Sequence, residues 1–242
     1  MEFIGFTYVT NFLENTLRNA MFEVIDEANK LFRDWGLRLR FIYLDSLTLE
    51  PGYLINVKTP EGTMRLYPLE VLVDFLDYRL KSEIEKNDGI KMNKILGLIS
   101  FPLASRSRYF DFYESFLGFQ AERLGRRILV LSMRPFESDV LRMALRTLES
   151  PHVEDDVKRL AGRILSHELE AFKRRLLKGI LHEVGHAFGL GHCSNPCVMN
   201  PPATMEEWDS RPVVFCNSCF TNLKRAVEEH RLSLKLEKAD GK

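Results

Sequence analysis

The sequence has no excess of charge of either sign and no long uncharged run of apolar residues. Its 242 residues include 34 Lys plus Arg and 34 Asp plus Glu, so the formal net charge is zero. A neutral chain lacks the basic excess that contact with a nucleic-acid backbone requires. The stretch of roughly 18 apolar residues that a membrane helix needs is also missing. We therefore expect neither a nucleic-acid partner nor a membrane span.

Cysteine is scarce, and all four cysteines follow residue 192. Four cysteines cannot staple a chain of this length, which is long enough to bury a core of its own. No basic stretch precedes an apolar one at Met1-Glu2-Phe3-Ile4, so the start does not resemble a secretion signal. With 45% hydrophobic and 28% charged residues, the composition is that of an ordinary globular protein. We expect a cytoplasmic, monomeric protein and interpret the clustered cysteines as metal ligands.

The hydrophobic periods along the chain predict an α/β (α+β) fold. Strand-like patterns come first, and the first two enclose a helical pattern, which predicts a β-α-β start. Helical patterns dominate from residue 138 onward, and residues 232–242 have the composition of a frayed charged tail. The predicted strands are 3–9, 37–49, 95–101, 127–133 and, at a sheet edge, 116–120. A hairpin is predicted near 51–62. The predicted helices are 11–35, 69–86, 138–148, 153–165 and 166–190.

One segment carries the residues of a metal centre. Residues 182–192 follow the pattern HExxHxxGxxH. His182 and His186 are four positions apart, so they lie on one face of the predicted helix, about 6 Å from each other. Gly189 can take the left-handed conformation that turns the chain sharply, which lets His192 reach the same metal. We predict that these three histidines bind a catalytic zinc ion.

Glu183 directly follows the first of these histidines. A carboxylate beside a zinc-activated water can take its proton, while the metal lowers the pKa of that water and polarises the scissile carbonyl. A glutamate on a helix is most often an ordinary surface residue, but its place within the motif predicts a general base. His152, His167 and His230 fit no ligand spacing, and we interpret them as structural or exposed residues.

The cysteines form a CxxxC pair, Cys193 and Cys197, and a CxxC pair, Cys216 and Cys219. Paired thiolates at such spacings can close a tetrahedral zinc site, and a site with four protein ligands is structural rather than catalytic. Two disulfides or four free buried thiols are the alternatives. A cytoplasmic location disfavours the first, and the repeated pairing disfavours the second. Because Cys193 is bonded to His192, we expect this zinc to stiffen the third catalytic ligand.

These residues, together with Met199 seven positions after His192, resemble archaemetzincin, a metzincin family of zinc metalloproteases with an additional four-cysteine zinc site. A lone methionine is usually core filler. Here Met199 is the candidate for the Met-turn, which metzincins place beneath the catalytic metal. The resemblance implies one metzincin-like zincin domain with a twisted mixed β-sheet and an active-site helix in an upper part, about 1–191, and the cysteine zinc in a lower part, about 192–231. It also implies two zinc ions per chain.

The resemblance extends upstream of the motif. Residues 116–121 and 125–127 are similar to the region of the family that contains the edge strand of the sheet. This similarity implies that the substrate lies along that strand, and it makes four residues candidates for substrate binding: Phe116, Leu117, Gly118 and Phe119.

Three features depart from the family pattern. The cysteine spacings are slightly shorter. The segment 138–166 is longer than the usual link into the active-site helix, and we interpret it as an insertion near the cleft and a candidate lid. Asn200-Pro201-Pro202 follows Met199, so the tyrosine that some metzincins place there as an extra zinc ligand is missing.

The motif favours a zinc-dependent peptidase that acts on a peptide or protein. Glu183 would take the proton of the attacking water and pass it to the leaving amine. Two alternatives belong to other classes: a zinc-stabilised peptide-binding or protein-binding protein with little or no turnover, and a four-cysteine zinc module for protein or nucleic-acid contacts. The presence of Glu183 argues against the first alternative. The zero net charge and the HExxH context argue against the second.

Overall fold

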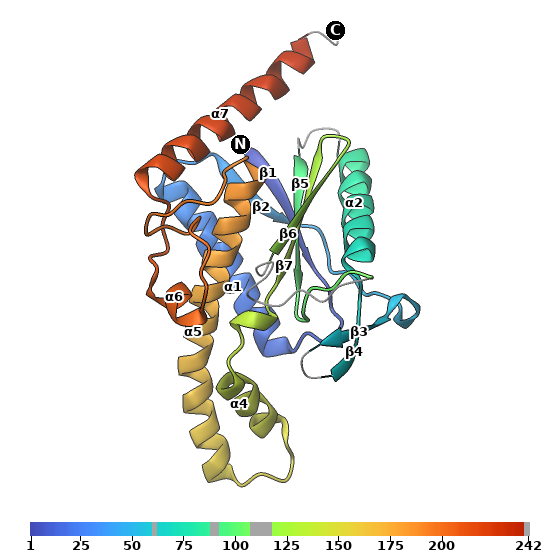
Figure 1. Ribbon diagram of the computed structural model, residues 1–242, viewed down its shortest axis with the longest axis vertical. Coiled ribbons are helices and arrows are strands. Elements are labelled where there is room, and N and C mark those ends of the chain that lie inside the picture. Colours follow the sequence, from blue (N-terminus) through green and yellow to red (C-terminus); the bar gives the residue numbers. More distant parts are fainter. Residues whose placement is uncertain (60–61, 88–91, 107–117, 240–242) are drawn as a thin grey trace.

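A twisted five-stranded sheet lies at the centre of the structure, a computed structural model that describes residues 1–59, 62–87, 92–106 and 118–239 (Figure 1). The strand order is β2-β1-β5-β7-β6. Four strands run parallel, and β6, at one edge, runs antiparallel to its neighbour β7. The strands are β1 (Glu2–Tyr8), β2 (Leu39–Tyr43), β5 (Met92–Ile99), β6 (Gly118–Arg123) and β7 (Arg126–Ser132).

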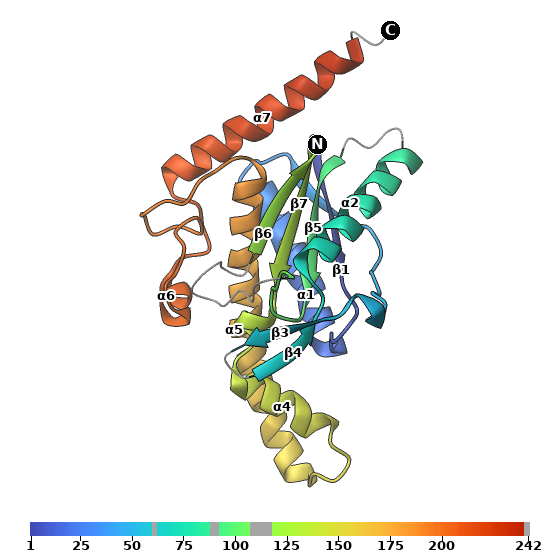
Figure 2. The same cartoon turned by 45° about the vertical axis from the view of Figure 1, so that its right-hand side comes forward.

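Helices cover both faces of this sheet, as the burial of strand β7 requires. Successive side chains of a strand point to opposite faces. Leu129 and Leu131 accordingly join the core beneath α1 and α5, whereas Ile128 and Val130 join the core beneath α2 (Figures 1 and 2). This arrangement of a mixed sheet between helices confirms the predicted α/β class. The three helices are α1 (Asn15–Asp34), α2 (Leu69–Lys86) and α5 (Asp155–Ala187).

Two hairpins complete the strands. The predicted hairpin is confirmed as the antiparallel pair β3 (Ile55–Thr59) and β4 (Gly62–Leu66). The second joins β6 to β7 through Leu124 and Gly125, whose φ angles are 50° and 74°. A two-residue hairpin turn requires this left-handed conformation. The turn places β6 at the sheet edge, close to where the sequence predicts a short strand.

The helix that carries the histidine motif is longer than predicted. Helix α5 continues for 33 residues, so the prediction of separate helices at 153–165 and 166–190 is wrong. No proline interrupts this stretch. The apolar stripe that packs on the core passes through Leu165 and Leu169 without a break, so one helix satisfies both patterns.

Other boundaries also differ from the predicted ones. Strand β2 ends at Tyr43 rather than near residue 49, because Asp45 takes a left-handed φ of 50° that turns the chain. Helix α7 runs to Ala239, so most of the expected charged tail has a helical backbone. The remaining helices are α4 (Asp139–Glu149), which lies beside the first half of α5 (Figure 2), α6 (Met205–Ser210) and α7 (Asn217–Ala239), with short 3₁₀ turns η1 (Pro51–Tyr53) and η2 (Arg134–Phe136).

A buried ion pair joins the amino ends of β1 and β5. The Glu2 and Lys94 side chains are 1% and 2% exposed, and Lys94 Nζ lies 3.2 Å from Glu2 Oε1. His230 of α7 approaches the same oxygen, with its Nδ1 at 3.0 Å. Burial alone would raise the pKa of Glu2, but His230 and Lys94 outweigh it and hold this pKa below its ordinary value. The cluster therefore attaches α7 to the sheet.

Replacing Glu2 with glutamine should reduce the free energy of unfolding by about 3–5 kcal/mol, because it leaves the Lys94 ammonium buried without its anionic partner. The double variant Glu2→Gln/Lys94→Met removes both charges and should recover most of the loss. Since the pKa of Glu2 is lowered in the folded protein, the contribution is present at neutral pH and is lost as the pH falls through that pKa. Denaturant unfolding measures both variants. A single variant as stable as the native protein would contradict this role of the pair.

Candidate active site

The last turns of α5 bring the motif histidines together. His182 and His186 lie on this helix, and the chain then turns at Gly189, whose φ is 83°. The turn is closed by a hydrogen bond from the N–H of Leu190 to the carbonyl of Gly185 (3.0 Å). It returns His192 to the other two rings, so that the ring centroids lie 4.5–5.3 Å apart. One nitrogen of each ring lies within 4.8 Å of the others.

Backbone carbonyls determine which nitrogen of these rings can bind a metal. His182 Nδ1 lies 2.7 Å from the carbonyl oxygen of Val198, and His186 Nδ1 lies 2.8 Å from that of Leu190. A carbonyl oxygen only accepts, so both Nδ1 atoms donate and, in a neutral ring, each Nε2 carries a lone pair.

These two Nε2 atoms lie 2.9 Å apart. Two lone pairs at this distance repel each other unless a cation lies between them. Burial lowers the pKa of His182 to about 3 and also lowers that of His186, so both rings are neutral at pH 7. Neutral imidazoles whose Nδ1 atoms donate to carbonyls are the form that binds zinc, so the donor set fits this metal.

The carboxyl group of Glu183 is buried against the edge strand. Its residue is 4% exposed, and burial raises the pKa of the carboxyl to about 8. A Cβ atom on Gly118, the first residue of β6, would collide with this carboxyl group. A side chain at position 118 would therefore have to displace the Glu183 carboxyl group, and the edge strand begins beside Glu183.

Met199 packs directly beneath the histidine helix. Its side chain is fully buried, and a Cβ atom on Gly185 would overlap its sulfur. The carbonyl of Met199 accepts a hydrogen bond from the N–H of Cys193 (3.0 Å). The absence of a side chain at position 185 thus allows the predicted Met-turn to approach α5.

The four cysteines form a second cluster next to the histidines. All are free thiols, so the disulfide alternative does not match the structure, and their sulfur atoms lie within 4.8 Å of one another. Zinc–sulfur bonds of about 2.3 Å place tetrahedral sulfurs about 3.8 Å apart, so this donor set fits a zinc ion. A hydrogen bond from the backbone of Cys219 lowers the pKa of the Cys216 thiol to about 7, whereas burial raises the pKa of Cys219.

The two clusters share the segment between Cys193 and Met199. Cys193 is bonded to His192, and Val198, which accepts the hydrogen bond from His182, lies between Cys197 and Met199. The N–H of Met199 also donates to the sulfur of Cys197 (3.3 Å). Movement of the cysteines would therefore displace the Val198 carbonyl that holds His182 and the backbone that is bonded to His192.

Sequence reasoning missed Arg127, which holds the end of the histidine helix. Its guanidinium, at the start of β7, donates to the carbonyl oxygens of His186 (3.1 Å) and Ala187 (3.0 Å). These carbonyls lie in the last turn of α5, where the regular helical hydrogen bonds end, and that of His186 also accepts from the N–H of Gly189 (2.9 Å). An arginine at the beginning of a strand gives no sign of this contact in the sequence.

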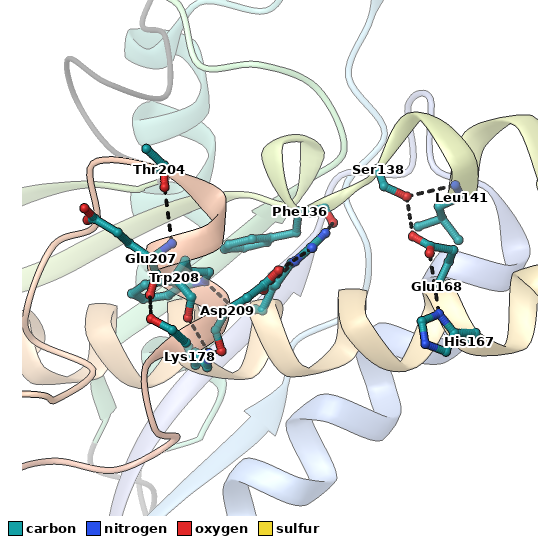
Figure 3. Close-up of polar contacts among 12 residues, drawn as sticks. Phe136, Ser138, Leu141, His167, Glu168, Lys178, Thr204, Glu207, Trp208 and Asp209 are labelled. Atoms are coloured by element: carbon teal, nitrogen blue, oxygen red, sulfur yellow. Dashed lines mark hydrogen bonds and ion pairs between the residues drawn. The ribbon is translucent and has the colours of Figure 1, made fainter.

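Lys178 was also missed, although a lysine within an apolar stripe is a detectable anomaly. Its ammonium group is fully buried and donates to the carbonyls of Trp208 and Asp209 at the end of α6 (Figure 3). Burial lowers the pKa of Lys178 to about 8. Arg175 adds a bidentate ion pair to Asp209. The Trp208 ring, held in this way, contacts His182 edge to face with the ring centroids 6.3 Å apart.

The remaining predicted residues lie as follows. Gly118 and Phe119 begin the edge strand β6, whereas Phe116 and Leu117 lie outside the described residues. The three histidines outside the motif belong to neither cluster: His152 and His167 are exposed, and His230 contacts Glu2. Figures 1 and 2 show that α4 and the first half of α5, the candidate lid, project beyond the end of the sheet, away from the half of α5 that carries the histidines.

The fold and the site define a zincin-like domain of the metzincin type. Its features are a mixed sheet, a long helix with HExxH, a third histidine after a glycine turn and a methionine beneath them. The model of peptidase family M54 matches residues 1–147 and 156–225 of this chain. The chain therefore belongs to peptidase family M54, a family of zinc metallopeptidases, and the resemblance to archaemetzincin is confirmed. The matched ranges leave out residues 148–155, where α4 ends and α5 begins, and residues 226–242.

Curated relatives match about a quarter of the chain. The chain is 37% identical to archaemetzincin of Archaeoglobus fulgidus over 62 residues, which are 26% of this chain and 39% of that protein. It is 44% identical to archaemetzincin of Pyrococcus horikoshii over 54 residues, 22% of this chain and 29% of that protein. The matched region thus spans about two fifths or less of the length of these two relatives.

Solved structures match almost the whole chain. The crystal structure of archaemetzincin from Methanopyrus kandleri has a TM-score of 0.57 and 20% identity, and covers 94% of this chain and 96% of that one. A zinc-dependent peptidase from Methanocorpusculum labreanum has a TM-score of 0.55 and 18% identity, over 91% and 99% of the two chains. At these identities the likeness establishes the fold. Within the described residues, every helix is too short or too polar to cross a bilayer.

Proposed function

We propose that this chain is a zinc-dependent peptidase in which His182, His186 and His192 hold the catalytic zinc and Glu183 is the general base. One observation carries the proposal: two Nε2 lone pairs face each other at 2.9 Å while both Nδ1 atoms are committed to carbonyls. A bound zinc ion would supply a Lewis acid for the scissile carbonyl and would activate a water molecule.

Glu183 moves the proton. Burial raises the pKa of this carboxyl group, and a zinc cation held by the neighbouring histidines would lower it again, so that the group is ionised at neutral pH. The carboxylate would then take a proton from the attacking water and pass it to the leaving amine, acting first as base and then as acid. Its burial beside the edge strand supports this role, because an extended substrate would pair with that strand. Strand β6 pairs with β7 along one side, and its other side offers backbone N–H and C=O groups to an extended peptide.

We further propose that the four cysteines hold a second, structural zinc ion, and that parts 1–191 and 192–231 form the two walls of the cleft. Purified protein should contain two zinc ions per chain by metal analysis. A chelator should remove the histidine zinc first, because its fourth position is open to water, and should leave the cysteine zinc and the fold intact. One zinc per chain, or simultaneous loss of both ions with unfolding, would remove the distinction between the two sites.

Peptide-library profiling by mass spectrometry tests the proposed activity. The native protein should cleave peptides, a chelator should abolish cleavage, and added zinc should restore it. A protein that retains peptides without cleaving them, with its zinc present, would support the zinc-stabilised binding protein instead. The same experiment gives the residue preference on either side of the cleaved bond.

Replacing Gly118 with alanine should lower kcat/KM by about tenfold to a hundredfold, because the added methyl group occupies space that the Glu183 carboxyl fills. Gly162→Ala is the matched control, since Gly162 lies on the same helix as Glu183 with open space around it. The control should keep native kcat/KM and gain a little stability. Steady-state peptide hydrolysis with metal analysis compares the two. Equal activity of both variants would show that the contact with Gly118 does not position Glu183.

A further inference from the structure

A pocket of about 240 Å³ lies outside both metal clusters. It is formed where β1, β5 and β7 end, between the hairpin β3–β4 and helix α4, at the lower end of the sheet in Figures 1 and 2. In open α/β sheets, ligands bind in the crevice beyond the carboxyl ends of the strands. The pocket therefore lies where this type of fold favours a ligand.

One wall of the pocket is aromatic. Phe12 and Phe101 meet edge to face with ring centroids 6.0 Å apart. Phe12 is 63% exposed and has a φ of 65°, a left-handed conformation that is unfavourable for a bulky residue. Such strain is concentrated at functional sites. The fold thus holds a large apolar side chain at the mouth of the pocket instead of burying it.

Much of the rest of the lining is basic. It includes Arg65 of β4, Arg134 of η2, and Arg142 and Arg146 of α4. Arg134 and Arg142 are paired with Glu137 and Asp139. Arg65 and Arg146 are exposed and make no ion pair with the described part of the chain. Two guanidinium groups are therefore available to an anion, and guanidinium binds carboxylate and phosphate through paired hydrogen bonds.

Glu14 adds a third, independent feature. Glu14 lines the pocket, and its Oε2 is buried and has no hydrogen-bond partner among the described residues. Buried polar atoms are nearly always hydrogen-bonded, so a group that binds here would complete the site. Burial and the nearby Glu149 raise the pKa of this carboxyl group, toward the neutral form that can donate to an anion.

We propose that this pocket is a second ligand site, for a small anion that carries an apolar group, such as an aryl or alkyl carboxylate or phosphate ester. The apolar group lies on Phe12 and Phe101, and the anionic group lies between Arg65 and Arg146. A volume of about 240 Å³ equals roughly eight water molecules, which suits a ligand the size of phenylacetate. The site is separate from the peptidase centre, so ligand binding is measured directly and does not depend on activity.

Calorimetry or protein NMR measures binding while the protein is titrated with phenylacetate, phenyl phosphate or the neutral isostere phenylacetamide. We expect either anion to bind at least tenfold more tightly than the amide. The double variant Arg65→Gln/Arg146→Gln should weaken anion binding at least tenfold. Glu14→Gln should change anion binding by no more than about twofold, because the amide keeps the shape of the neutral carboxyl group and still offers a hydrogen-bond donor. Arg163→Gln, an exposed arginine on α5 outside the pocket, is the control and should change nothing.

The relative affinities of phenylacetate and phenyl phosphate identify which anion the pocket prefers. Absence of binding up to about 10 mM ligand would overturn the proposal, since that concentration detects even affinities weaker than 1 mM. Equal binding of the neutral amide would also overturn it, as would markedly weaker anion binding by Glu14→Gln or an undiminished affinity of the double arginine variant.

Discussion

Replacing Glu183 with glutamine should reduce kcat/KM for peptide hydrolysis by about 10²- to 10⁴-fold while both zinc ions remain bound. The amide has nearly the same shape as the carboxyl group but cannot accept the proton of the attacking water. Glu183 is buried beside the edge strand and does not belong to the group of three histidines that could hold the metal. The expected loss therefore concerns proton transfer and not the metal.

Measurements of kcat/KM, zinc content and melting temperature distinguish a loss of proton transfer from a loss of the metal. Glu170→Gln, the same substitution at an exposed position of α5, is the control and should leave all three unchanged. If Glu183→Gln loses the catalytic zinc, then Glu183 supports the metal and is not the general base. If the variant keeps its zinc and its activity, the proton is moved by another group.

Replacing Cys219 with serine should destabilise the protein by several kcal/mol, because a zinc site that loses one thiolate loses much of its binding free energy. Activity should then fall through the histidine site. The cysteine segment contains Val198, whose carbonyl orients His182, and it is bonded to His192. A loosened cysteine cluster should therefore weaken zinc binding by the histidines as well.

Thermal unfolding and metal titration compare Cys219→Ser with Glu183→Gln. The cysteine variant should melt at a lower temperature and bind the catalytic zinc more weakly, whereas the glutamate variant should do neither. Ser218→Ala, an exposed residue in the same turn of α7, controls for a change in the helix itself. Unchanged melting, two zinc ions and native affinity in Cys219→Ser would exclude the proposed coupling between the clusters.

The candidate metal ligands could be predicted from the sequence because they are local. Residues 182 and 186 share one helix face, and a glycine turn returns residue 192, so spacing alone implies their proximity. Gly118 and Arg127 belong to strands that precede this helix by many residues. Their contacts with α5 depend on how the sheet packs on the helix, and periodicity does not contain that information.

The fold class was also predictable, since the buried runs of β5 and β7 and the helical stripes show their periods clearly. The break predicted near residue 166 was wrong for a physical reason. Polar residues separate two apolar patterns here, so the sequence suggests two helices. Both patterns lie on the same face of one continuous helix, and no residue between them breaks it. Strand β2 ends earlier than predicted because Asp45 takes a left-handed φ that turns the chain. The alternating pattern of the sequence continues past this residue and gives no sign of the turn.

The division of the core into two clusters has a consequence for the synthesis of this protein on the ribosome. Every buried member of the core on the α2 side lies between Val9 and Val130, whereas the core on the α1–α5 side draws on residues as late as Val227. All seven predicted metal ligands follow the last strand of the sheet. A nascent chain can therefore complete one face of its sheet before any metal ligand has been translated. A chain released before residue 182 would have a partly built scaffold and no centre able to cut its neighbours.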